Sequence, residues 1–401
     1  MDFTKEEVLQ YVAEEDVKFI RLAFCDVFGK QKNISIMPRE LERAFSTGIA
    51  IDGSAIQGFG SSVHSDLFLK PDPTTLSVLP WRPDHGRVIR LFCSIEKPDG
   101  SAFLPDSRFL LKKAIQDAKE EGISFAFGSE MEFYLFYRDE KGEPTHIPYD
   151  RAGYMDIAPE DKGENVRREV CLTLEQMGIY PESSHHEEGP GQNEIDFRFS
   201  EPLRAADDAV TFKAVVKTIS EKCGLFSDFS PKPIPDFAGN GMHINFSAKA
   251  SDGRDVMPYV MAGVLSHIKE MTLFLNINKC SYARLGQSKA PKYISWSREN
   301  RSQLIRIPAA EGEYKRAELR SPDPLCNPYI AYALIIYAGL DGIANKTELP
   351  DSVDENLFSS EAPSLDKLDS LPLSLSEAKA AADCQFIKKC LPAELIQAYS
   401  K

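Results

Sequence analysis

The strongest constraint on the fold is a strand-like segment, residues 125–136, that carries two acids on an otherwise apolar run. Apolar and other residues alternate there, so Phe127, Met131 and Phe133 share one side of a strand while Glu130 and Glu132 share the other. Two carboxylates so close repel each other and lose hydration when they are partly buried. The segment therefore predicts a sheet with one apolar face and a positive group between the acids of the other face.

The same alternation recurs in three later segments, and a further acid, Glu187, stands just upstream of the first of them. Their polar positions are Glu194, Asp196 and Arg198 in 191–199, His243, Asn245 and Ser247 in 241–247, and Arg316, Glu318 and Arg320 in 316–320. If these strands share a sheet, one face gathers Glu130, Glu132, Glu187, Glu194, His243 and Glu318. Oxygen ligands with one imidazole suit Mg²⁺ or Mn²⁺, and the pattern predicts a site for such a hard cation.

Zinc is the competing interpretation of the histidines, because His185 and His186 are adjacent. Neighbouring residues on a strand point to opposite faces, so the two rings do not converge on one ion. The eight cysteines are scattered without a Cys-x-x-Cys pair, and no thiol cluster completes a tetrahedron. We therefore expect free thiols and no structural zinc.

Charge is unevenly distributed along the 401 residues. The chain has 61 acidic and 47 basic residues, a net charge of −14, and this surface disfavours nucleic acid as a partner. The segment 279–320 nevertheless carries ten basic against four acidic residues, the latter being Glu299, Glu311, Glu313 and Glu318. Arginine recognises phosphate and carboxylate in a bidentate manner, and an arginine cluster beside a metal cage is what phosphoryl transfer requires. The chain lacks the Gly-x-x-x-x-Gly-Lys-Ser/Thr phosphate loop.

Turn residues at 97–100 predict a boundary between a small mixed unit, 1–100, and a large α/β or α+β domain, 101–401. Helical patterns follow Asp106, a good N-cap, and recur near 161–177, 205–222 and 256–275. The stretch 346–373, rich in Ser, Asp, Leu and Pro, predicts a surface excursion before a helix capped at Ser374.

The longest apolar run, Tyr329–Leu340, is shorter than a membrane-spanning helix requires, and it opens after Asn327-Pro328 like a capped helix. The amino terminus has neither the basic start nor the apolar core of a secretory signal. Together with the scattered cysteines, these features predict a cytoplasmic protein that has no membrane partner.

Many ordered motifs resemble those of the type I glutamine synthetases of bacteria and archaea. They are Asp52-Gly-Ser-Ala-Ile-Gln-Gly-Phe, Ser65-Asp-Leu-Phe-Leu-Lys-Pro-Asp, Gly128-Ser-Glu-Met-Glu-Phe, His185-His-Glu-Glu-Gly-Pro-Gly-Gln-Asn-Glu194, Gly241-Met-His, Asn300-Arg-Ser, Ile305-Arg-Ile-Pro and Glu318-Leu-Arg-Ser-Pro-Asp-Pro-Leu-Cys-Asn-Pro-Tyr. The resemblance implies an α+β fold with a small N-terminal β-grasp domain and a large catalytic domain whose curved antiparallel sheet is flanked by helices. It also implies a homo-oligomer, a dodecamer of stacked rings, with active sites between neighbouring subunits.

The resemblance also assigns residues to roles. One metal would be held by Glu132, Glu187 and Glu194, and a second by Glu130, His243 and Glu318. The nucleotide would meet Ser247, Arg301, Arg306 and Arg316, and substrate would meet Gly239, Arg284 and Arg320. The catalytic residues would be Asp52, which draws in ammonium, together with Arg301 and Arg320.

The implied reaction consumes ATP with Mg²⁺ or Mn²⁺ and takes glutamate and ammonia, or a related acid and amine, as small-molecule substrates. The side-chain carboxylate is phosphorylated, and the amine then attacks the acyl phosphate. Phosphate supplies the leaving group that a carboxylate lacks, and metals with arginines stabilise its charge.

The chain departs from the family pattern at three places. Lys289, in Lys279-Cys-Ser-Tyr-Ala-Arg-Leu-Gly-Gln-Ser-Lys289-Ala-Pro, stands where the flap of the family carries a catalytic Glu, and its charge would repel ammonium. Ala238 replaces an Asn that binds the amino acid, unless Asn240 substitutes for it. Phe358 replaces a tyrosine that some members adenylylate.

Three interpretations follow from the departures. The chain is a glutamate–ammonia ligase, a ligase of the same chemistry for another acid or amine, or a non-catalytic paralogue. The preserved carboxylates argue against the third, because unused acids are costly to keep buried.

Overall fold

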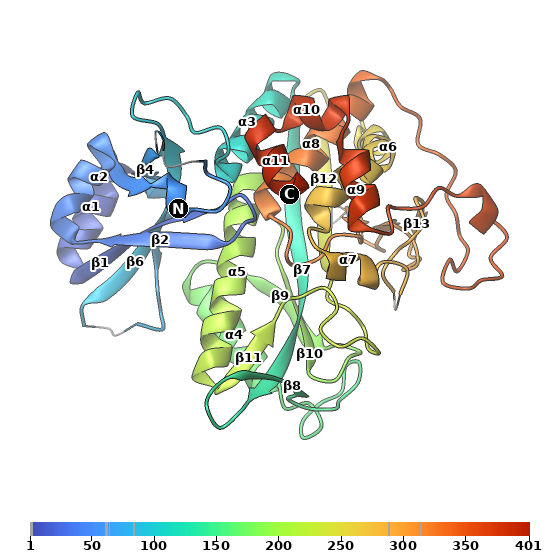
Figure 1. The fold of residues 1–401 in the computed structure, drawn as a ribbon, viewed down its shortest axis with the longest axis horizontal. Helices are drawn as coiled ribbons and strands as arrows, with labels where there is room; N and C mark the ends of the chain where they lie inside the picture. The colour runs from blue at the N-terminus through green and yellow to red at the C-terminus, as the bar shows by residue number, and fades with distance from the viewer. Residues whose placement is uncertain are drawn as a thin grey trace.

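A computed structural model describes residues 3–60, 63, 65–82, 85–287, 289–310, 312 and 315–401. Two of the acids in the basic segment, Glu311 and Glu313, lie outside the described residues. A small N-terminal domain, blue in Figure 1, stands to one side of a larger domain of helices and sheet that contains the C-terminus. The α+β organisation expected from the sequence is therefore confirmed.

The N-terminal domain is built on a sheet with strand order β2-β1-β6-β4-β3, in which β5 adds to β6. Its two central strands, β1 and β6, run parallel, and the other pairs are antiparallel. The elements of this domain are α1 (Lys5–Glu14), β1 (Val17–Cys25), β2 (Gln31–Ile36), α2 (Leu41–Thr47), β3 (Ile49–Asp52), β4 (Asp66–Pro71), β5 (Ser77–Val78) and β6 (Arg87–Glu96).

The larger domain is organised around β7, the longest described strand, which runs through its centre (Figure 1). The strand order of its sheet is β13-β14-β15-β12-β7-β10-β9, with β8 and β11 also paired to β7. The strands are β7 (Ile123–Arg138), β8 (Pro144–Pro148), β9 (Pro181–His186), β10 (Gln192–Phe197), β11 (Leu225–Asp228), β12 (Met242–Ala250), β13 (Trp296–Arg298), β14 (Ile305–Ile307) and β15 (Ala317–Leu319). All these pairs are antiparallel except β13–β14.

Helices pack on the apolar face of this sheet, as the alternation in 125–136 predicts. Phe127, Met131 and Phe133 are fully buried, and the Phe127 ring stacks on Tyr332 with 4.4 Å between centroids. The helices of the larger domain are α3 (Ser107–Glu120), α4 (Glu164–Gln176), α5 (Pro202–Lys222), α6 (Met257–Leu275), α7 (Lys279–Arg284), α8 (Pro328–Ala344), α9 (Leu375–Ala382), α10 (Gln385–Cys390) and α11 (Ala393–Ser400).

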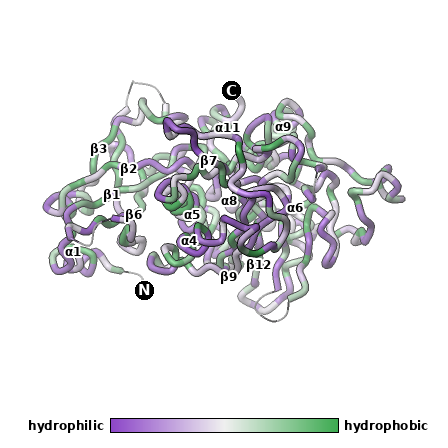
Figure 2. The backbone as a smooth tube through the Cα atoms, turned by 90° about the horizontal axis from the view of Figure 1, so that it is seen from below, coloured by the Kyte–Doolittle hydropathy of each residue, from purple (hydrophilic) through white to green (hydrophobic). Residues whose placement is uncertain are grey.

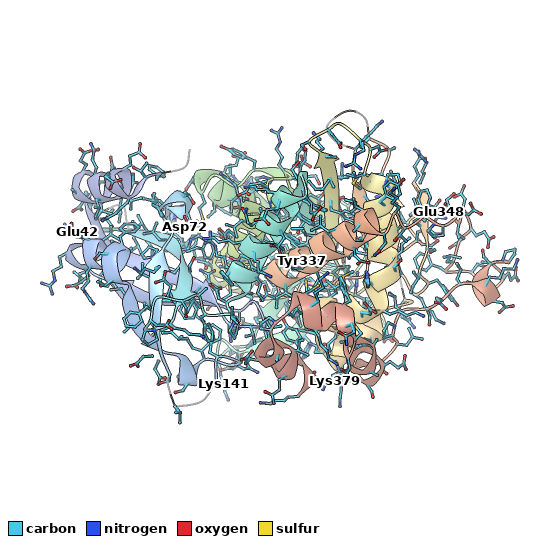
Figure 3. All side chains as sticks on the ribbon, turned by 90° about the horizontal axis from the view of Figure 1, so that it is seen from above. Glu42, Asp72, Lys141, Tyr337, Glu348 and Lys379 are labelled. Atoms are coloured by element: carbon cyan, nitrogen blue, oxygen red, sulfur yellow. The ribbon has the colours of Figure 1, made fainter. Side chains whose placement is uncertain are left out.

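The helix N-caps expected from the sequence are present. Asp106 accepts from the Arg108 amide at the start of α3, Asn327 accepts from the Tyr329 amide at the start of α8, and Ser374 caps α9. The apolar run 329–340 lies within α8, a mostly buried helix whose Tyr337 reaches α3 through a hydrogen bond to Asp117 (Figure 3). Among the described residues, no helix combines the length and the apolar character needed to cross a membrane.

Arg108, on α3, connects the two domains through a buried ion cluster. Its guanidinium binds both oxygens of Asp207 on α5, at 3.0 and 2.9 Å, and donates to Asp72, 2.9 Å away, at the edge of the N-terminal domain (Figure 3). Burial alone would raise the pKa of Asp72, but Arg108 and the Thr74 hydroxyl outweigh it and hold the pKa at about 2. The Asp72 contribution to stability is therefore present at neutral pH and is lost as the pH falls through about 2.

Replacing Arg108 with Ala should lower the free energy of unfolding by about 3–5 kcal/mol, because Asp207 would remain buried without its partner. Denaturant titration measures this loss. Arg254→Ala serves as the control: that arginine is mostly exposed and pairs only with Asp252, so its loss should cost less than about 1 kcal/mol. Equal losses in the two variants would contradict the role given to the cluster.

Candidate functional site

The pairing of β7 with its two neighbours brings the predicted acids together. Glu194 on β10 stands directly opposite Glu132, and Asp196 stands opposite Glu130. On the other side of β7, His243 of β12 is the partner of Glu130. Residues directly opposite each other in a sheet point to the same face, so these side chains share the face that the helices leave open. The sheet face expected from the alternation therefore exists.

This face forms the floor of a cavity of about 520 Å³. Its wall includes the predicted residues Glu130, Glu132, Glu187, Glu194, Gly239, His243, Arg284, Arg301, Arg306, Arg316 and Arg320. Acids from the middle of the sheet and arginines from the chain after residue 284 thus face one enclosed space. The separate acidic and basic features of the sequence belong to one site.

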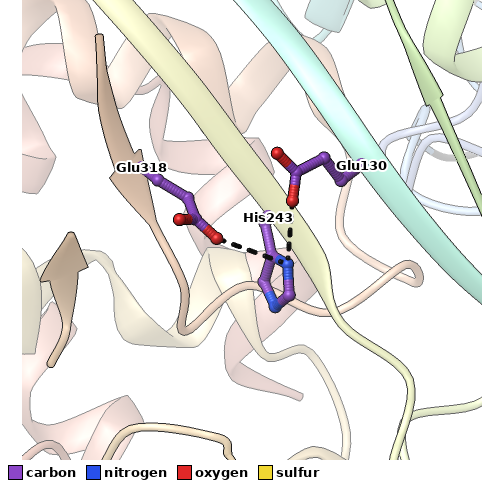
Figure 4. Close-up of side chains that lie close together, drawn as sticks. All are labelled: Glu130, His243 and Glu318. Atoms are coloured by element: carbon purple, nitrogen blue, oxygen red, sulfur yellow. Dashed lines mark hydrogen bonds and ion pairs between the residues drawn. The ribbon is translucent and has the colours of Figure 1, made fainter. Parts of the chain in front are cut away.

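His243 and Glu130 line the cavity, and with the buried Glu318 beside them they form one group of potential metal ligands (Figure 4). The Nδ1 atom of His243 lies 3.3 Å from Glu130 Oε2 and 3.6 Å from Glu318 Oε1. Burial, followed by the nearby positive charge of Arg320, lowers the pKa of His243 well below its ordinary value. The imidazole is therefore neutral at physiological pH, and this is the form that binds metals.

Two arginines hold Glu318, which is fully buried beside His243. Arg306 Nη1 lies 2.7 Å from Glu318 Oε2, and Arg320 contacts Oε1. The Nε atoms of both arginines are buried without a hydrogen-bond partner among the described residues. Both arginines also line the cavity, so their guanidinium groups are placed to bind an anion such as phosphate there.

A second group of potential ligands consists of His185, Glu187 and Glu194, and a third of Glu130, Glu194 and Asp196. In each group, ligand atoms lie within 4.8 Å of one another. Glu132 is turned slightly away: its Oε2 accepts from the Gly241 amide at 2.7 Å. The geometry therefore groups His185 with Glu187 and Glu194, where the resemblance assigns Glu132.

The electrostatics of these acids indicate a missing positive charge. Burial, reinforced by Glu187 and Glu132 respectively, raises the pKa values of Glu132 and Glu194 well above the ordinary value. Burial and the neighbouring Glu130 raise the pKa of Asp196 to about 6. Like charges gathered out of water favour protonation unless a cation replaces the proton. A donor set of carboxylates with imidazole nitrogens fits Mg²⁺ or Mn²⁺.

His186 points to the opposite face of the strand from His185, as the strand pattern predicts, and its buried ring stabilises the β9–β10 hairpin. Its ring is fully buried; Nε2 lies 2.8 Å from Asp150 Oδ1, and Nδ1 lies 2.6 Å from the Glu187 carbonyl. Asp150 Oδ1 also accepts from the Gly191 amide. These contacts orient the backbone that carries Glu187 and Glu194.

Arg284 and two glycines shape the wall opposite the hairpin. Arg284 is buried and donates to the carbonyls of Ser321 and Arg320, at 2.8 and 3.1 Å. A Cβ at Gly241 would lie 2.6 Å from the Arg284 guanidinium and 2.8 Å from His243, so no side chain fits there. A Cβ at Gly239 would lie 2.3 Å from the Pro231 carbonyl. Asn240, the alternative to the missing Asn, is fully buried and is bonded to Ser230 and Asp228 carbonyls instead of facing the cavity.

Three predicted residues are not part of the cavity wall: Glu318, which is buried next to it, and two residues that lie farther away. Ser247 is on β12, on the same face as His243 and Asn245 but beyond them. Asp52 ends β3, at the edge of the N-terminal sheet, far from β12 (Figure 2). Its carboxylate is exposed and accepts from the Ser54 amide and hydroxyl. Within one chain, therefore, Asp52 and the acidic cavity are not brought together.

A second cavity, of about 840 Å³, adjoins the first and shares Pro308, Ala309 and Arg316 with it. Its other wall residues are largely apolar and include Met257, Met261, Trp296, Ile307 and Leu349. The two adjoining cavities therefore present a largely apolar wall in the second cavity, Arg316 where the two meet, and acidic residues in the first cavity.

The structure adds wall residues that were not predicted as site residues, among them Asp196, His185, Glu188 and Tyr154. Asp196 was already part of the alternation, and His185 could have been assigned to the same face, since the two stand opposite Glu130 and Glu194. Glu188 and Tyr154 gave no such signal, because both lie in connections outside the strands. Lys289 is also part of the wall.

A β-grasp-like domain followed by a sheet that holds carboxylates against arginines, with an apolar compartment alongside, defines a class of protein. It is the arrangement of enzymes that handle a nucleotide together with divalent cations. Comparisons with known proteins are consistent with this class. The family described as "Glutamine synthetase, beta-Grasp domain" matches residues 16–98, and "Glutamine synthetase, catalytic domain" matches residues 105–401.

Relatives resemble the chain over nearly its whole length. A glutamine synthetase of Clostridium saccharobutylicum is 44% identical, and the match covers 94% of this chain and 88% of the relative. A glutamine synthetase of Methanosarcina mazei is also 44% identical, and the match covers 99% of this chain and 92% of the relative. The solved structure of GmaS in complex with ADP has a TM-score of 0.88 at 27% identity, covering 98% of this chain and 93% of that chain. Plasmodium falciparum glutamine synthetase, at 22% identity and a TM-score of 0.87, shows the same fold.

The chain belongs to the glutamine synthetase family. It is accordingly a ligase that forms carbon–nitrogen bonds, and its predicted fold, with a β-grasp domain and a helix-flanked catalytic sheet, is confirmed.

Replacing Glu132 with Ala should remove one Mn²⁺ per chain, because the ligand set on the β10 side of the sheet would lose a carboxylate. Isothermal titration with Mn²⁺ counts the sites. Glu182→Ala, an exposed acid on β9 outside the cavity wall, is the matched control and should leave the count unchanged. An unaltered count in Glu132→Ala would instead favour His185 as the third ligand of Glu187 and Glu194.

Proposed function

We propose that this chain is a glutamate–ammonia ligase that uses ATP to form glutamine through a γ-glutamyl phosphate. One observation carries the proposal: acids from β7, β10 and the β9–β10 connection, His243 of β12 and arginines from 284–320 line a single cavity, and a largely apolar compartment adjoins it. A nucleotide needs such a compartment for its base, arginines for its phosphates and cations for its charge.

The proposed roles follow the positions of the side chains. Arg316, shared by the two cavities, together with Arg301 and Arg306, would bind the phosphates, with Ser247 beyond them on β12. Arg320 and Arg284, with Gly239 between the walls, would position the substrate acid. Mg²⁺ or Mn²⁺ at the acidic groups would supply charge neutralisation for the phosphoryl group.

The proposal also includes assembly into rings and a cytoplasmic setting. Asp52 is exposed and is not part of the cavity wall of its own chain, and this supports a site completed by a neighbouring subunit. The eight free cysteines support a reducing compartment. We place the division of the chain into domains at 1–100 and 101–401.

A second candidate is a ligase of the same chemistry that joins a different amine to glutamate or a related acid. The observation that favours it is the flap: Lys289 lines the cavity at the position where the family carries an acid, and Ala238 lines it at the position of an Asn. Lys289 and Ala238 both stand at positions where the acid and amine substrates are expected to bind, and not where ATP is expected.

The purified protein should release ADP when ATP, Mg²⁺ or Mn²⁺, glutamate and an amine are all present. Omitting the metal should abolish the release, because the acidic groups would remain uncompensated. A coupled assay of ADP measures the rate. A folded, metal-loaded protein that releases no ADP with any acid or amine of a broad panel would contradict the ligase proposal.

Mixing two inactive variants should restore part of the activity if Asp52 serves the cavity of a neighbour. Asp52→Asn and Glu130→Ala, each inactive alone, would be dissociated together and reassembled. Mixed oligomers then contain some sites with both an intact Asp52 and an intact cavity. No recovery beyond that of either variant reassembled alone would show that Asp52 does not complete a neighbour's site.

A further inference from the structure

The Lys289 side chain lies in a corner of the acidic cavity that Glu188 and Tyr154 form, and both of these residues contact its ammonium group. Its Nζ atom lies 2.5 Å from Glu188 Oε1 and 5.1 Å from the centre of the Tyr154 ring. A carboxylate on one side and an aromatic face on the other are the two groups that attract a primary ammonium most strongly. All three residues line the cavity.

The corner is connected to the rest of the site. The Tyr154 ring packs edge-on against His185, with 5.4 Å between centroids, and the Glu188 amide donates to Glu187 Oε2 at 3.0 Å. The carbonyl of Lys289 accepts from Arg320, at 3.4 Å. An ammonium in this corner therefore lies against the residues that carry the second group of potential metal ligands.

The backbone of Lys289 is held in an unfavourable conformation for this contact. Its φ angle is +66°, in the left-handed region that residues with a Cβ rarely adopt. Such strain persists where the surrounding structure imposes it, and it gathers at functional sites.

We propose that Glu188 and Tyr154 form the binding site for the amine substrate and that this substrate is a primary alkylammonium. The Lys289 side chain occupies the site until the amine displaces it. The inference rests on the ligase chemistry proposed above, and it names the amine of the second candidate reaction, in which an alkylammonium replaces ammonia. The Lys289 ammonium, at the end of four methylene groups, is itself an alkylammonium and shows what the corner accepts. Ammonium would meet the same carboxylate and ring, but it has no alkyl group to fill the part of the cavity that the Lys289 side chain takes.

Steady-state ADP release with glutamate and either ammonium or ethylammonium tests the competition. Replacing Lys289 with Met should lower the KM for ethylammonium by about tenfold, the ratio expected when one half-exposed ion pair and one cation–π contact no longer compete. Adding Glu188→Gln to this variant should reverse the gain. Tyr154→Leu should raise the KM for ethylammonium more than the KM for ammonium.

The control is Lys388→Met, on α10. Lys388 also lies 2.5 Å from a carboxylate, Asp383, and is similarly exposed, but it is remote from the cavity. Its replacement should leave both KM values unchanged. If Lys289→Met also leaves the KM for ethylammonium within about twofold of the wild-type value, the proposal is wrong.

Saturation-transfer NMR with ethylammonium and the full-length protein gives a result that does not depend on turnover. Transfer to the ethyl protons should be seen with Lys289→Met and lost with Lys289→Met/Glu188→Gln. Transfer without ADP release from any amine would overturn the proposed function while supporting the amine site. No transfer with Lys289→Met, in a protein that turns over ammonium, would overturn the amine site and leave the proposed function intact.

Discussion

The register of β7 against β10 and β12 is the constraint on which the rest of the site depends. Because successive side chains of a strand face opposite ways, a slip by one residue would turn Glu130 and Glu132 into the helices and expose Met131 and Phe133. The apolar face prevents that slip. Phe127 stacks on Tyr332 of α8, and the odd-numbered residues of β7 from 123 to 135 are buried. The packing of the core therefore also determines where the charges stand.

The charges gathered by that register oppose folding, and the structure compensates them only in part. Glu318 is neutralised by Arg306 and Arg320, and Glu132 receives the Gly241 amide. Glu194 and Asp196 have no comparable cation near them among the described residues, and burial raises the pKa of each. Uncompensated acids that the core holds in place are a reason for a protein to bind divalent cations tightly.

Sequence reasoning was most successful where one local pattern determines the structure. Period-2 alternation placed Glu130, Glu132, Glu194 and His243 on one face, and cap residues such as Asp106 predicted helix starts. It was incomplete where segments distant in the chain meet. The Lys289–Glu188 pair joins residues about a hundred positions apart in two connections, where no periodicity restricts direction. Strand β15 is only Ala317–Leu319, so the alternation in 316–320 extends past the paired residues.

Lys289 shows why a charge in a site has to be assessed together with its partner. Taken alone in the sequence, it places a positive charge where the family has a negative one, and it would repel a cationic amine. In the structure Glu188 supplies the negative charge from the opposite wall, so the acid has not been lost from the cavity but stands on another segment. A cation that replaces the Lys289 ammonium meets a carboxylate, as it would with an acidic flap. The difference is that the Lys289 ammonium must first leave Glu188. An amine that is attracted to the Tyr154 ring is better able to displace it.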